Sequence, residues 1–141
     1  MQKTIFLLLM AFFAAGCGEN RIDQVKFEKA YRSAKALQTC DLGDSTLMLS
    51  QYSKEFEIEC SILLPSAKTM GENDLTAKFC DASHYVKLAV LARIHQNERI
   101  ARYGKEDGLS SGTGEWRRAQ DAIANACEWY ERGEVESNEN K

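Results

Sequence analysis

The chain has 141 residues with one proline, and its 18 Lys and Arg residues against 21 Asp and Glu residues give a formal net charge of −3. This acidic balance argues against a nucleic acid as partner, because binding to phosphates requires concentrated positive charge. The length suits one domain with one hydrophobic core, and scarce proline beside abundant Ala, Glu, Lys and Arg favours helices.

The first 16 residues have the pattern of a bacterial signal peptide. Lys3 supplies a positive start, and residues 4–15 form an apolar run. The run is too short for a transmembrane helix, which needs ~20 residues to cross a hydrocarbon core of ~30 Å. It ends in Ala-Ala-Gly-Cys at positions 14–17, which resembles the lipobox of bacterial lipoproteins, with Ala where Leu is usual. The resemblance implies that Cys17 receives a lipid with palmitate chains and anchors the chain to a membrane; the alternative is an ordinary signal peptide in which Cys17 is incidental.

The residue after the lipidated cysteine indicates whether a lipoprotein stays in the inner membrane or moves to the outer membrane. Asp at this position favours retention in the inner membrane in enterobacterial-type sorting, whereas this chain has Gly18. We therefore expect a lipoprotein of the outer membrane that faces the periplasm. The tether at 17–20 reaches at most ~14 Å when extended, so the folded body is expected to stay close to its membrane.

Apolar residues at three- and four-residue spacing predict a first helix over 21–39. Region 45–64 can be interpreted in two ways. A helical stripe passes through Leu49, Phe56 and Cys60, but positions 56–64 also alternate between apolar and mostly polar residues as a strand does. We favour the helix over a β-hairpin, because a lone hairpin is marginally stable.

Two further helices follow. The third is expected to begin after an N-cap at Asn73 and to end at Gly104, and it is apolar over most of its circumference, which is typical of a central helix. The last begins near Thr113 and ends at Gly133. We predict one helical domain over 21–133 and a disordered tail over 134–141.

Four cysteines remain after the lipobox, and an even number in an exported chain predicts two disulfides. A four-thiolate zinc site is the alternative, but it usually contains closely spaced cysteine pairs, which this sequence lacks. Helix lengths in an up-down bundle place the cysteines in two pairs by height: Cys60–Cys80 and Cys40–Cys127. If region 45–64 were a hairpin, the pairs would become Cys40–Cys60 and Cys80–Cys127.

No set of residues predicts catalysis or a cofactor. Cys80 and His84 share a helix face beside Asp81, but an oxidised cysteine would leave only His84 and His95, about 16 Å apart along the helix. Ser83 and His84 are adjacent and therefore point about 100° apart. The glycine-rich loop at 108–114 lacks the lysine of a P-loop. We therefore expect no enzyme, no metal and no cofactor.

The residues with the best prospects of contacting a partner are one aromatic and a group of basic side chains. Aromatic residues dominate protein interfaces, and the basic residues were expected to gather around the last inter-helix loop. This set comprises Trp129, Arg102, Lys105, Arg117 and Arg118.

These features predict a small disulfide-linked helical bundle that binds another envelope protein without catalysing a reaction, as an accessory of envelope or secretion-system assembly. In general build the chain resembles secretin pilotins. It equally resembles immunity and exclusion lipoproteins, which implies the alternative function of blocking a toxin, a cell-wall enzyme or an incoming plasmid or phage apparatus.

Overall fold

The computed structural model describes residues 19–104 and 111–135, so the predicted signal peptide and Cys17 lie outside the described residues. Within these ranges the only extended pairing is an isolated antiparallel bridge between Arg21 and Glu134. The all-α prediction is confirmed, and region 45–64 is a helix rather than a hairpin. The described chain forms four helices: α2 (Gln24–Gln38), α3 (Thr46–Ser66), α4 (Met70–Tyr103) and α5 (Thr113–Arg132).

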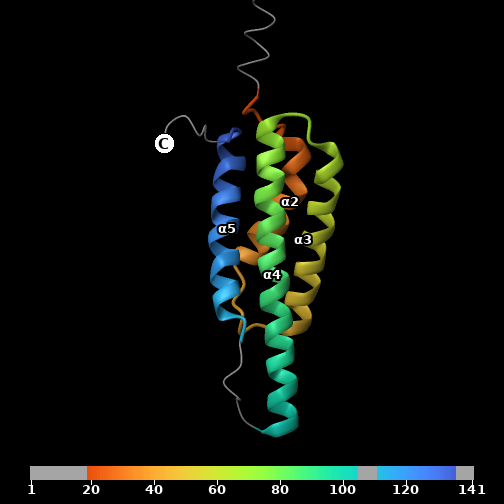
Figure 1. The fold of residues 1–141 in the computed structure, drawn as a ribbon, viewed down its shortest axis with the longest axis vertical. Helices are drawn as coiled ribbons and strands as arrows, with labels where there is room; N and C mark the ends of the chain where they lie inside the picture. Colours follow the sequence, from red (N-terminus) through yellow and green to blue (C-terminus); the bar gives the residue numbers. More distant parts are fainter. Residues whose placement is uncertain (1–18, 105–110, 136–141) are drawn as a thin grey trace, which may run out of the picture.

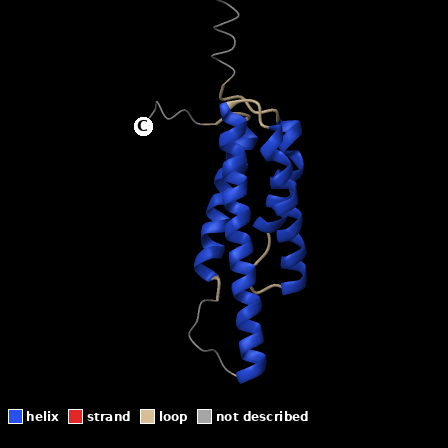
Figure 2. Cartoon of the chain, turned by 45° about the vertical axis from the view of Figure 1, so that its right-hand side comes forward, coloured by secondary structure: helices blue, strands red, loops and turns tan. Residues whose placement is uncertain are grey.

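The four helices form an antiparallel bundle in which α4 packs between α3 and α5, and α2 contacts the same two neighbours (Figure 1). Figure 2 shows the helices side by side around a shared interior. The centre of the core holds three fully buried rings. Phe79 of α4 lies 6.2 Å from Phe27 of α2 and 6.1 Å from Phe56 of α3, measured between ring centroids. Phe27 and Phe56 therefore join α2 and α3 to α4 through Phe79, in agreement with the apolar stripes of the sequence.

Helix α4 begins earlier than its sequence suggested. The predicted cap, Asn73, is already inside the helix, and the Thr69 hydroxyl instead accepts the amide of Glu72 at 3.1 Å. The sequence Thr-Met-Gly-Glu at 69–72 has the spacing of a capping box. The predicted ends are confirmed, because Gly104 and Gly133 close α4 and α5 in the left-handed conformation with φ of 76° and 73°.

The 34 residues of α4 make a helix about 50 Å long at 1.5 Å per residue. Figure 1 shows that its C-terminal part extends well beyond the other helices. The greater length of α4 agrees with the sequence prediction. The predicted start of α5 at the tip of α4 is wrong, because α5 begins further along the bundle. Gly112 sits against Ala89, so closely that a Cβ on Gly112 would come within 2.4 Å of the Ala89 carbonyl oxygen. Along the bundle axis, helix α5 therefore starts about 20 Å from the level of Arg102, in the direction of the N-terminus of α4, since 13 residues separate Ala89 from Arg102.

The prediction of two disulfides is not supported. Cys40, Cys60, Cys80 and Cys127 are all free thiols. The predicted Cys40–Cys127 pair is wrong because α5 begins at the level of Ala89 rather than at the tip of α4. Gln120, not Cys127, reaches the end of α2, where its side-chain amide donates to the Leu37 carbonyl at 3.0 Å. Cys127 lies seven residues, or about 10 Å, further along α5, whereas bridged Cα atoms must lie within ~7 Å.

The other predicted pair consists of neighbours that are not bonded. The Cys80 sulfur lies 3.9 Å from the carbonyl oxygen of Cys60, so the two residues do occupy the same height on α3 and α4. Their sulfur atoms are nevertheless not at bonding distance. The disulfide expectation came from the predicted export of the chain, and the bundle holds together around its apolar core without such a link.

Candidate functional site

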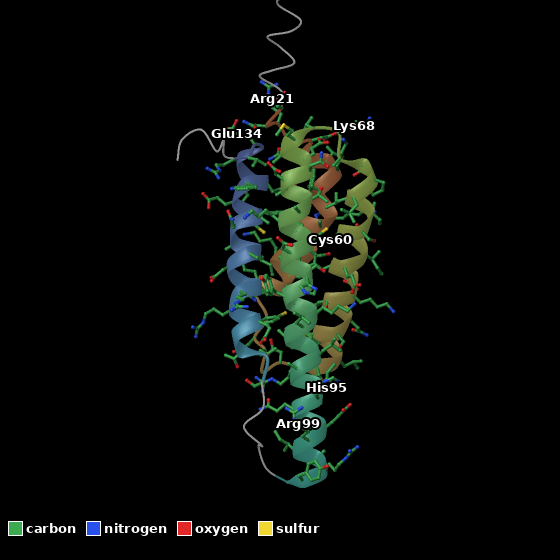
Figure 3. The ribbon with its side chains drawn as sticks, viewed as in Figure 1. Arg21, Cys60, Lys68, His95, Arg99 and Glu134 are labelled. Carbon is green, nitrogen blue, oxygen red and sulfur yellow. The ribbon has the colours of Figure 1, made fainter. Side chains whose placement is uncertain are left out.

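The two ends of the bundle differ in construction. At one end the chain enters the fold and is held by backbone hydrogen bonds. Gly71 N donates to the Glu19 carbonyl at 2.7 Å, and Val135 N donates to the Asn20 carbonyl at 3.0 Å. We call this end the latch, made of residues 19–23, 66–72 and 133–135. Figure 3 labels Arg21, Lys68 and Glu134 there.

Glu72 is the centre of the latch. Its side chain is buried, with 3% of the residue exposed. One carboxylate oxygen accepts the Lys26 ammonium at 2.9 Å and the Lys68 amide at 3.0 Å, and the other accepts the Asp23 amide at 3.1 Å. Burial raises the pKa of Glu72, but the hydrogen bonds from Lys68, Lys26 and Asp23 outweigh this effect and lower the pKa overall. Glu72 therefore joins α2, the α3–α4 turn and α4 as a buried, ionised group.

The latch also depends on a close backbone contact. A Cβ on Gly71 would lie 2.6 Å from the backbone carbon and oxygen of Asn20. Only glycine allows the incoming chain to approach α4 this closely. The latch was not predicted, and the packed body extends past the predicted boundary at 133 to Val135, which is buried. The rest of the predicted tail, 136–141, lies outside the described residues.

At the opposite end α4 extends beyond the other helices (Figure 1), although Gln96 and part of the Arg99 guanidinium are buried there. We call residues 95–104 the projecting end; Figure 3 labels His95 and Arg99 on it. Arg102 is exposed, and 66% of Tyr103 is exposed. The projecting end thus presents a basic and an aromatic side chain to solvent on one rigid helix, which is a chemistry suited to contact with a protein.

The predicted partner residues do not form one cluster. Arg117 and Arg118 are exposed on α5, five or six residues from Gly112 in the direction of the latch. Along the bundle axis they therefore lie about 27 Å from Arg102. Lys105 lies outside the described residues. The single basic rim expected from the sequence is thus split along the bundle.

Trp129 lies near the latched end of α5. It is half-buried, and the Lys78 ammonium of α4 lies 5.2 Å from its ring centroid. This distance allows a cation–π interaction. The ring therefore already has an intramolecular partner on α4.

The sequence candidates for chemistry are dispersed. His84 and His95 are exposed, whereas Ser83 is buried. Among the residues that the structure describes, no three His, Cys, Asp or Glu side chains gather closely enough to hold a metal ion. A shallow groove of ≈ 220 Å³ lies between α3 and α4, with Lys54, Glu57 and Leu91 in its lining. Typical ligand pockets have about 300–1,000 Å³, so this groove is small for a substrate.

The buried thiols are held in their neutral form. Burial raises the pKa of Cys127 to about 11. Burial also raises the pKa of Cys60, with a further contribution from the neighbouring Cys80. Cys40 is half-buried, and its pKa is raised by burial and by the nearby Asp44. None of these thiols has the depressed pKa of a catalytic nucleophile.

In the described part of the chain, no helix combines the length and apolar character needed to cross a bilayer. No protein-family model, curated protein or solved structure matches the chain.

Proposed function

We propose that the protein is a lipoprotein anchored through Cys17, facing the periplasm from the outer membrane, and that it binds another envelope protein without catalysing a reaction. The observation that carries this proposal is the contrast between the two ends. The chain leads towards Cys17 from the latch, while the projecting end lies about 50 Å away at the far end of α4. A lipid at Cys17 would therefore hold the latch at the membrane and present the projecting end to a partner.

The anchor is tested on the full chain. Covalent lipid on the mature protein should be seen by mass spectrometry, and Cys17→Ser should accumulate as unprocessed precursor. A mature protein without lipid would refute the anchor.

The binding site is tested by photo-crosslinking in cells. A photoreactive amino acid at Tyr103 should give one dominant cross-linked partner, because this position is exposed on the projecting end. The matched control is Leu88, which is also exposed on α4 but lies midway along the bundle. Equal cross-linking at both positions, or none at Tyr103 in cells that depend on the protein, would refute the proposed site.

The identity of the cross-linked protein separates the two roles considered. A secretion or envelope component supports the assembly role, and a toxin, cell-wall enzyme or transfer component supports the immunity role. Replacing His84 and His95 together should leave the phenotype intact in either case, since both are exposed and lie apart. Loss of the phenotype with the fold retained would point to catalysis instead.

A further inference from the structure

The latched end carries an unusual set of exposed apolar side chains. Four large apolar residues there are mostly in solvent: Val25 (81% exposed), Leu64 (63%), Met70 (62%) and Ile62 (56%). Single exposed apolar residues are ordinary on protein surfaces, but these four lie around the same end of the bundle. Ile62 and Leu64 flank the buried Leu63 and point to different sides of α3, about 200° apart. We call these four residues the anchor-end patch.

Contacts of the latch hold together the three helix ends that carry these residues. Its residues come from the start of α2, the end of α3 and the start of α4. Lys26, next to Val25, donates to the Ser66 carbonyl at 3.3 Å, which holds the first turn of α2 beside the last turn of α3. Thr69, next to Met70, donates to the Arg21 carbonyl at 2.9 Å. The three helix termini therefore present their apolar side chains at the same end of the bundle.

The position of the chain identifies what covers this patch. Glu19 is bonded to Gly71, the residue after Met70, and Cys17 precedes Glu19 by only two residues. Two residues span at most ~7 Å. A lipid on Cys17 would therefore hold the anchor-end patch within a few ångströms of the bilayer surface, which leaves little room for a protein between them.

The exposed charges at this end are mixed, with Arg21 and Lys68 (Figure 3) beside Glu19, Asp23 and Glu134. Attraction to anionic headgroups is therefore not what would hold this end at a membrane. The contribution would come from burying its apolar side chains in the interfacial region. A lipid anchor by itself fixes proximity but leaves the body free to tilt.

We propose that the anchor-end patch rests in the headgroup region of the membrane that holds the lipidated Cys17, so that the bundle stands upright and its projecting end points away from the bilayer. This inference rests on the anchoring proposed above and adds an orientation to it. The patch acts as a second, weaker membrane contact beside the covalent lipid.

The test uses the lipidated protein in vesicles of phosphatidylethanolamine and phosphatidylglycerol with brominated acyl chains. Two single variants each add a tryptophan, Met70→Trp in the patch and Leu47→Trp as a control. Leu47 is similarly exposed (71%) but lies at the start of α3, at the other end of the bundle. Circular dichroism should show the same helix content for both variants, because both side chains are in solvent.

We expect the bromines to quench the fluorescence added at position 70 and to leave that added at position 47 unchanged. Equal quenching at both positions would mean that the bundle lies flat, and would overturn the proposed orientation. No quenching at position 70 in protein that floats with the vesicles would overturn the proposal while leaving the anchor intact. A mature chain without covalent lipid would overturn both. If position 70 were shielded from a water-soluble quencher in native envelopes but not in the vesicles, the patch would be covered by a protein partner, and this result would also overturn the proposal.

Discussion

The latch and the projecting end are built on opposite physical principles although both contain part of α4. The latch joins three segments from distant parts of the sequence through a buried carboxylate, Glu72, and a glycine, Gly71, in backbone contact. The projecting end includes the buried Gln96, which accepts from Arg93 at 3.0 Å, but its last residues are exposed. One end is thus specialised for fixed position and the tip of the other for access, so substitutions at the latch and at the tip should separate stability from binding.

The largest loss of stability is expected from Glu72→Ala. The substitution leaves two partly buried backbone amides and the Lys26 ammonium without their acceptor, so the free energy of unfolding should fall by about 3 kcal/mol. The matched control is Glu57→Ala, which removes a carboxylate whose ion pair with Lys87 is half exposed. The control should change stability by less than about 1 kcal/mol. Urea unfolding followed by circular dichroism measures both, and equal losses would contradict the central role of Glu72.

The contribution of Glu72 should also depend on pH. Its pKa is lowered in the folded state, so its charge stabilises the fold above the ordinary glutamate pKa of about 4.3, and this contribution is lost as the pH falls through the lower folded value. The difference in unfolding free energy between the wild type and Glu72→Gln should therefore be constant near neutral pH and should shrink below about pH 4. A difference that grows on acidification would contradict the direction of the shift.

A smaller loss is expected from Gly71→Ala. The added methyl group would meet the Asn20 backbone at 2.6 Å, and overpacking of this kind costs about 1–3 kcal/mol. Gly114→Ala is the matched control, because Gly114 lies in helix α5 with no atom within 4 Å of the added Cβ. The control should be neutral or stabilising by up to about 1 kcal/mol. Hydrogen exchange should also accelerate at residues 19–23 in Gly71→Ala alone; unchanged exchange there would contradict the close contact.

The thiols allow the two halves of the bundle to be compared without substitution. Cys40 follows α2 near the end opposite the latch and is half-buried, whereas Cys127 is buried with a pKa of about 11. Because the thiolate is the reactive form, iodoacetamide at pH 8 should modify Cys40 at least about tenfold faster than Cys127. Mass spectrometry of peptides without reductant gives these rates. A peptide that joins any two of the four cysteines would contradict their assignment as free thiols.

The smallest effect on stability is expected at the projecting end. Tyr103→Ala and Arg102→Ala should each change the unfolding free energy by less than about 0.5 kcal/mol, because both side chains are exposed. The same substitutions should weaken binding of the cross-linked partner, measured with purified proteins. Normal binding by the double variant would remove the projecting end as the binding site, while a large loss of stability would show that this end is not independent of the core.

Local rules of helix formation explain what the sequence predicted correctly. The spacing of Phe27, Phe56 and Phe79 revealed the inward faces of three helices, and Gly104 and Gly133 revealed two helix ends, because both signals depend on residues close in sequence. The latch was missed because the partners of Glu72 are up to 49 residues away. The Thr-x-x-Glu spacing at 69–72 could have revealed the true start of α4 but not the burial of its glutamate.

The proposed partner residues and cysteine pairs depended on the relative heights of the helices. Those heights are set by where the connection after α4 returns, and a sequence gives the length of that connection but not its path. The close contact of Gly112 with Ala89 fixes the level at which α5 begins. It therefore separates Arg102 from Arg117 and Cys40 from Cys127, two relations that no local pattern contains.

The pairing of Asn20 with Val135 has a mechanical consequence. If Cys17 carries the proposed lipid, a partner that pulls on α4 would send tension through the bundle to that lipid, and the force would leave the fold through residues 19–23. Val135 and Gly71 both hold this segment, so the load is shared between the ends of two helices rather than peeling one strand from a single neighbour. The fold would then yield only when bonds to both sides fail together, which is the behaviour of a joint that can transmit force between a membrane and a protein bound at its far end.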